Sequence, residues 1–210
     1  MKVPLIWKKM LVENYKVVNS SNILKWAKEL NKNELNSIDY LQKHGYLVRI
    51  IRGIFYVVSP DEREMGYFEC SIFERIAMAM EAKGVKKWYF GLESALKLNN
   101  MTHEYFDINH VFTDSYMTTK IIKISDSNFR FYKRKKEHFK FGIMKKSQIY
   151  FSDPERTVLD LAYNRYLKSK EPNYFLSPIK EHHEVLDPDK LGNYLSYYSQ
   201  RFQKGYEAIL

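Results

Sequence analysis

One predicted helix carries side chains suited to hydrogen bonding with the edges of DNA bases. In a helix over residues 33–44, the turn of about 100° per residue opposes one polar set to Leu35, Ile38 and Leu41. That set comprises Asn33, Asn36, Tyr40, Lys43 and His44, with Ser37 at its edge. A solvated face usually carries Glu and Lys in pairs, whereas a reader of the major groove needs amides, hydroxyls and cations. The polar, nearly uncharged face therefore favours recognition of DNA over simple solvation.

Three helices and a hairpin are expected to position this face. Apolar spacing predicts helices around residues 3–11, 20–30 and 33–44, then strands over 46–51 and 54–58. Gly45 supplies the stop of the third helix. Arg52 and Gly53 separate the strands, which is typical of a two-residue turn whose second position tolerates a positive φ. This order of elements predicts a winged helix-turn-helix.

Positive charge is concentrated in the same segment. Residues 1–60 hold ten Lys and Arg against four Asp and Glu, a net +6 out of +9 for the whole chain. Contacts between cations and phosphates release counterions and so contribute to DNA affinity. Many basic proteins nevertheless bind no nucleic acid, and the hairpin arginines alone fit a solvated surface equally well. The candidate DNA-contacting residues are Ser21, Lys25, Lys28, Asn33, Asn36, Ser37, Tyr40, Lys43, His44, Arg49 and Arg52.

The sequence predicts an α+β protein of two domains. Polar residues over 59–63 form a break, so we expect a winged helix-turn-helix DNA-binding domain at 1–62 and a mixed α+β domain at 63–210. Later apolar patterns predict a helix that Gly84 ends, strands at 88–90, 108–113, 120–124, 129–133, 139–143 and 148–151, and helices that begin near Asp153 and Asp187. The stretch 168–184 is expected to be a polar connection.

A second basic segment has two interpretations. Residues 130–146 hold eight Lys and Arg against the single acid Glu137, with aromatic residues between them. Such a strand pair could be a further phosphate-binding surface with aromatic stacking. Alternation of aromatic and basic residues more often means aromatics inward and cations outward on a half-exposed sheet, and we favour that structural interpretation.

Neither a catalytic motif nor a metal-binding motif is visible in the sequence. Phosphate-binding loops, dinucleotide fingerprints and zinc-hydrolase signatures are all missing, and the histidines are scattered. Glu155, Arg156 and Asp160 are expected to form structural ion pairs. We therefore expect a protein that is not an enzyme, with no cofactor and no metal. Cys70, the lone cysteine, excludes an intrachain disulfide, and no apolar stretch could span a membrane, so a cytoplasmic location is expected.

Three passages resemble the AbiEi-type antitoxins of type IV toxin–antitoxin systems. They are the passage from Lys43 to Leu47 continued by Arg49 to Tyr56, the passage from Tyr89 to Leu96, and the passage from Ser152 to Leu161. The resemblance implies a winged-helix transcriptional regulator of viral defence that represses its own promoter, often at inverted repeats, as a homodimer on double-stranded DNA. It also implies that 63–210 is an antitoxin or regulatory domain, which counteracts its functional partner, a nucleotidyltransferase toxin, without forming a stable complex with it. Since no apolar stretch could span a membrane, we expect no membrane partner.

Two other functions compete with a regulator. A nucleic-acid-processing enzyme could use the first domain to deliver substrate to the second, and it would turn over DNA or RNA with Mg²⁺ or Mn²⁺. A winged helix that binds only proteins would show neither turnover nor a salt-sensitive interaction with DNA.

Overall fold

The computed structural model describes residues 4–31 and 34–207, with the side chains of residues 34 and 35 also outside the description. It is a mixed α+β structure with two sheets, which confirms the expected α+β class. Contacts divide the chain into two compact units, residues 1–86 with 123–127 and residues 87–122 with 128–210. Within the described ranges, the helices are all too short or too polar to span a bilayer.

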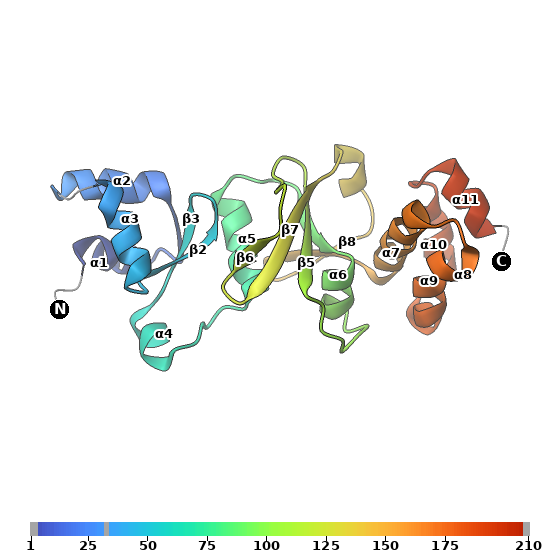
Figure 1. The fold of residues 1–210 in the computed structure, drawn as a ribbon, viewed down its shortest axis with the longest axis horizontal. Helices are drawn as coiled ribbons and strands as arrows, with labels where there is room; N and C mark the ends of the chain where they lie inside the picture. Colours follow the sequence, from blue (N-terminus) through green and yellow to red (C-terminus); the bar gives the residue numbers. More distant parts are fainter. Residues whose placement is uncertain (1–3, 32–33, 208–210) are drawn as a thin grey trace. The chain divides into compact units, whose positions relative to one another are not determined.

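Helices and a three-stranded sheet make up the first unit, whose elements can be followed in Figure 1. Its elements are α1 (Leu5–Val12), β1 (Val17–Asn19), α2 (Ser20–Glu29), α3 (Glu34–Lys43), β2 (Leu47–Ile51), β3 (Ile54–Val57), α4 (Pro60–Met65) and α5 (Ile72–Ala82). The sheet has the order β1-β3-β2 and is antiparallel throughout. Gly53 has φ +80° at the hairpin turn and Gly45 has φ +68° after α3, which confirms both expected roles.

The core of the first unit explains why its helices form. Trp7 and Met10 of α1, Ile23 and Ala27 of α2, and Leu41 of α3 are buried in one apolar cluster with residues of the hairpin. A helix of about ten residues is marginal in isolation, so the burial of these apolar stripes supplies most of its stability. Asn19 additionally caps α2, because its side chain accepts a hydrogen bond from the Asn22 amide at 2.9 Å.

The segment after the hairpin differs from the expectation. Residues 59–63, predicted to be a polar break, begin α4, because Ser59 and Glu62 form a reciprocal capping box. Helix α5 packs on β1, β2 and β3, and its Arg75 donates to Ser125 Oγ at 3.0 Å. The contacts thus group residues 63–86 with the first unit, whereas the domain boundary near residue 62 stays a prediction.

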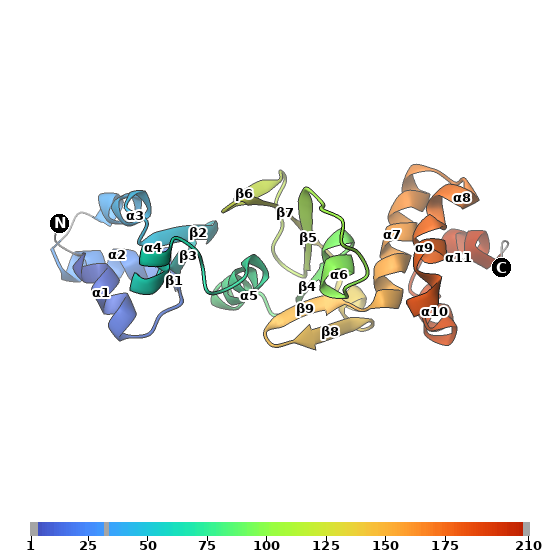
Figure 2. The same cartoon turned by 90° about the horizontal axis from the view of Figure 1, so that it is seen from below.

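The second unit combines a six-stranded sheet with a helical C-terminal part. Its elements are β4 (Trp88–Gly91), α6 (Glu93–Leu98), β5 (Ile108–Thr113), β6 (Ile122–Ile124, shared with the first unit), β7 (Ser127–Lys133), η1 (Lys136–Phe139), β8 (Ile143–Lys146), β9 (Ile149–Ser152), α7 (Pro154–Lys168), α8 (Pro172–Phe175), α9 (Ser177–His182), η2 (His183–Val185), α10 (Pro188–Leu195) and α11 (Gln200–Glu207). The strand order is β6-β7-β5-β4-β9-β8. Helices α8, α9 and α10 pack against α7 (Figure 2).

Two expectations for this unit are wrong. The strand predicted over 139–143 is replaced by η1 and a turn in which Gly142 has φ +57°. The polar connection predicted over 168–184 contains α8 and α9, because Phe175 and Leu176 are buried against the α7 side chains Leu159 and Ala162. In both places tertiary packing outweighs the local sequence signal.

A buried guanidinium joins α7 to the sheet of the second unit. Arg156 is 1% exposed and donates to the Phe141 carbonyl and to the Tyr89 hydroxyl. Its Nε lies 3.5 Å from Asp160 Oδ2, and its charge lies between the two rings, at 4.3 Å from each centroid. The expected structural role of this ion pair is thereby confirmed.

Replacing Arg156 by alanine should destabilise the protein strongly. The change leaves Asp160 without its cation, and it removes the donor to the Phe141 carbonyl and the Tyr89 hydroxyl in a buried place. The free energy of unfolding should therefore fall by about 3–5 kcal/mol. Urea titration followed by circular dichroism measures the loss, with Lys168→Ala at the exposed end of the same helix as the control. A loss no larger than that of the control would contradict the assigned role.

Candidate functional site

The strongest candidate site is the outer face of α3 together with the neighbouring hairpin of the first unit. Leu41 is 1% exposed and Ile38 packs partly buried against the core, so the opposite side of the helix faces outward. On that side Asn36, Tyr40 and Lys43 are exposed. Ser37 is half-buried at the edge. The predicted orientation of α3 therefore agrees with the structure for these residues, while Asn33 and the side chain of Leu35 lie outside the described part.

Tyr40 and His44 form a stacked pair at the end of α3. Their ring centroids are 4.1 Å apart, with planes inclined by 30°. His44 Nδ1 also lies 2.9 Å from the Tyr40 carbonyl oxygen, which holds the imidazole against the helix end. Tyr40 and Lys43 are exposed, whereas His44 is half-buried. An exposed aromatic ring and a cation can contact bases and phosphates as well as solvent.

The cations expected to hold phosphates lie on three elements of this unit. Lys25 and Lys28 are exposed on α2, Arg49 is exposed on β2, and Arg52 is exposed in the hairpin turn. Arg49 lies over the Phe55 ring at 5.5 Å. Ser21, the remaining candidate, is exposed, and its hydroxyl donates to the Asn19 cap at 2.7 Å, so it supports the start of α2. Helix α2 packs against α3, and α3 contacts β2.

Helix α4 holds the end of α3, a feature that the sequence analysis missed. Arg63 donates from Nη1 to the carbonyl oxygen of His44 at 2.7 Å, directly after α3. Its guanidinium carbon lies 3.9 Å from the centroid of the Tyr46 ring. A cation here satisfies a carbonyl that the helix leaves unpaired and complements the negative end of the helix dipole.

Glu62, next to Arg63, fixes the start of α4 through its carboxylate. It is 3% exposed and accepts hydrogen bonds from the Tyr56 hydroxyl at 2.6 Å and from the Ser59 and Glu69 amides at 2.8 and 3.0 Å. Burial raises the pKa of the Glu62 carboxyl, but these hydrogen bonds lower it further, and the net pKa lies below the ordinary value. The spacing of Ser59 and Glu62 is a capping-box pattern, and this sequence signal could have predicted α4.

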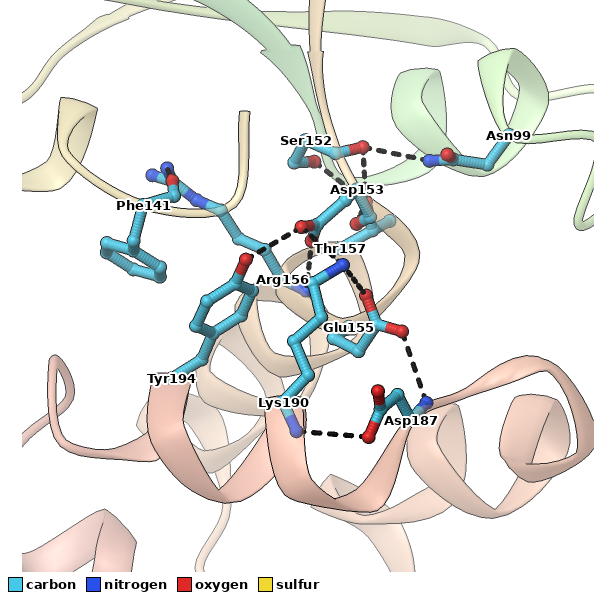
Figure 3. Close-up of polar contacts among 10 residues, drawn as sticks. All are labelled: Asn99, Phe141, Ser152, Asp153, Glu155, Arg156, Thr157, Asp187, Lys190 and Tyr194. Carbon is cyan, nitrogen blue, oxygen red and sulfur yellow. Dashed lines mark hydrogen bonds and ion pairs between the residues drawn. The ribbon is translucent and has the colours of Figure 1, made fainter. Parts of the chain in front are cut away.

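A second polar cluster lies at the start of α7, in the second unit (Figure 3). Asp153 and Glu155 are buried, and Lys190 Nζ reaches them at 3.0 and 2.7 Å. Asp153 also caps α7 and accepts a hydrogen bond from Tyr194 at 2.9 Å. The lysine bridges both carboxylates, so the cluster ties α10 to α7 and is a structural element of this unit.

The basic segment 130–146 follows the structural interpretation favoured above. On β7, Phe129 and Phe131 are buried while Arg130 and Lys133 are exposed, and Phe141 after it is also buried. Within the described ranges, no three His, Cys, Asp or Glu side chains gather in a way that could hold a metal ion.

Comparison with known proteins shows a likeness of fold. No protein-family model and no curated protein matches the chain. Among solved structures, the chain is similar to the crystal structure of the RV2827C protein from Mycobacterium tuberculosis. The TM-score is 0.62 at 10% sequence identity, over 93% of this chain and 72% of that chain. At this identity the likeness concerns the arrangement of the backbone alone.

Replacing Glu62 by glutamine should destabilise the protein at neutral pH and less so in acid. A carboxylate with a lowered pKa stabilises the fold above the pKa of the unfolded chain, about 4.5, and this contribution disappears as the pH falls through the lowered value. We expect a loss of about 1–3 kcal/mol at pH 7 for the hydrogen bonds to a charged group. Urea titrations at several pH values measure it, and a difference that grows below pH 4 would refute the argument.

Proposed function

We propose that this protein is a DNA-binding transcriptional regulator whose first unit works as a winged helix-turn-helix. Helix α3 would enter the major groove, and the β2–β3 hairpin would form the wing. The observation that supports the proposal best is the exposed row of Asn36, Tyr40 and Lys43, flanked by exposed cations on α2 and the hairpin. The proposal is supported because motifs of this class use an exposed helix on a packed core to read the major groove.

The side chains of the interface divide by their chemistry. Asn36 and Lys43 carry donors and, for the amide, an acceptor that fit base edges, so they would supply sequence preference. Lys25, Lys28, Arg49 and Arg52 would neutralise phosphates, which positions the protein without reading sequence. The AbiEi resemblance extends the proposal to an antitoxin that represses its own promoter as a homodimer at inverted repeats, in functional opposition to a nucleotidyltransferase toxin.

An assay for turnover of nucleic acids distinguishes this proposal from the enzymatic alternative. Incubation with DNA and RNA in the presence of Mg²⁺ or Mn²⁺ should leave both nucleic acids intact, while the same protein should shift a duplex from its own promoter in a salt-sensitive manner. Cleavage or transfer on either nucleic acid would favour the enzyme.

Arg52→Ala should weaken binding to all duplexes alike. Because the arginine is assigned to a phosphate, its loss should lower the slope of log affinity against log salt concentration by about 0.9. Fluorescence anisotropy with promoter and unrelated duplexes at several salt concentrations measures the slope. Lys8→Ala, an exposed cation on α1, serves as the control, and an unchanged slope in Arg52→Ala removes this residue from the interface.

Asn36→Ala should instead relax the preference at one base pair. An amide that pairs with a base edge contributes about 1–3 kcal/mol of discrimination, so the variant should lose that preference and keep its salt slope. Competition between the preferred duplex and single-base-pair variants measures the effect. If Asn36→Ala and wild type rank all these duplexes identically, Asn36 does not read a base.

A further inference from the structure

A cavity lies beside the turn that follows α3, where this turn and β2 face α4 and the residues directly after it. Its volume is about 320 Å³, within the range of small-molecule sites, and it opens to solvent. The walls come from the first unit and include one acid and one arginine: His44, Gly45, Val48, Val58, Glu62, Arg63, Gly66, Tyr67 and Phe68. Tyr67 is 61% exposed at this cavity, whereas Val58 is 5% exposed and closes its inner side.

The charge at the wall of this cavity favours an anion. Arg63 carries a guanidinium with five N–H donors, and the bond that it makes to the His44 carbonyl uses one nitrogen. Glu62 also lines the cavity, but its carboxylate oxygens already accept hydrogen bonds from Tyr56 and from the amides of Ser59 and Glu69. Among the described residues, no carboxylate lies within ion-pair distance of Arg63.

The apolar side chains in the wall indicate which kind of anion would fit. Val48 and Val58 are aliphatic, and Tyr67 and Phe68 offer aromatic surface, so a flat apolar ligand would bury area against them. A carboxylate on that ligand could accept two parallel hydrogen bonds from the guanidinium fork. The geometry points to a binding site for a small aromatic carboxylate that controls the end of α3.

Control would follow from competition for Arg63. A carboxylate that accepts from both Nη atoms of the fork competes with the His44 carbonyl for Nη1, and the carbonyl after the last turn of α3 then loses its donor. Ligand binding then favours an altered helix end, and by linkage duplex and ligand weaken each other by the same factor. This regulatory part rests on the proposed DNA-binding function, whereas occupation of the cavity does not.

Benzoate is a suitable probe, with the neutral analogue benzamide for comparison at equal ionic strength. Millimolar benzoate should raise the melting temperature of the wild-type protein more than benzamide does, because a ligand of the folded state stabilises it. The same benzoate should lower the affinity for the promoter duplex about fivefold or more. Lys8→Gln on α1, which leaves the cavity unchanged, should respond as the wild type does.

Two variants test the cavity by different routes. Arg63→Gln removes the cation, and Val48→Phe fills the space while keeping Arg63, so both should lose the response to benzoate. The assignment is overturned if benzoate and benzamide act alike on the wild type, or if both variants still respond as it does. Binding of benzoate through Arg63 without any change in duplex affinity overturns the regulatory part. If the protein has no affinity for the duplex, the proposed function is contradicted. The melting temperatures then still test whether benzoate binds in the cavity.

Discussion

Burial of Leu41 on the inner side of α3 decides which side chains of this helix meet solvent. Successive residues of a helix are about 100° apart, so a helix that inserts Leu41 into the core must turn Tyr40 and Lys43 outward. The burial of Leu41 is therefore enough to orient the proposed interface toward solvent. It depends on the apolar cluster that α1, α2, α3 and the hairpin share, and a change that loosens this core would alter the interface as well.

The outward face also depends on how α3 ends. Gly45 turns the chain, and Arg63 then satisfies the His44 carbonyl while Glu62 fixes α4 through three hydrogen bonds. The group that holds the helix end also borders the cavity, so the proposed regulation would act on the helix end itself. A ligand could shift this contact only by as much as it prefers the arrangement in which the contact is released.

Local signals predicted much of the fold, and tertiary contacts explain the rest. Gly45, Gly53 and the apolar stripe through Leu41 act within a few residues, so the helix end, the hairpin turn and the orientation of α3 follow from sequence. Strand β1 was missed because its three residues are a strand only through their pairing with β3. Helix α4 was missed although Ser59 and Glu62 carry its signal, and the reach of Arg63 to His44 depends on the packing of α4. The outer residues of α3 could thus be predicted from the sequence, but the support and the cavity behind them could not.

Selection of binding sites from a random pool of duplex DNA tests the central claim most directly. The wild-type protein should enrich a defined motif of several base pairs, because a helix that reads base edges discriminates at each contacted position. A variant with alanine at Asn36, Tyr40 and Lys43 keeps the buried side of α3 and should enrich none. Recovery of the same motif by both proteins, or of no motif by the wild type, would contradict the account.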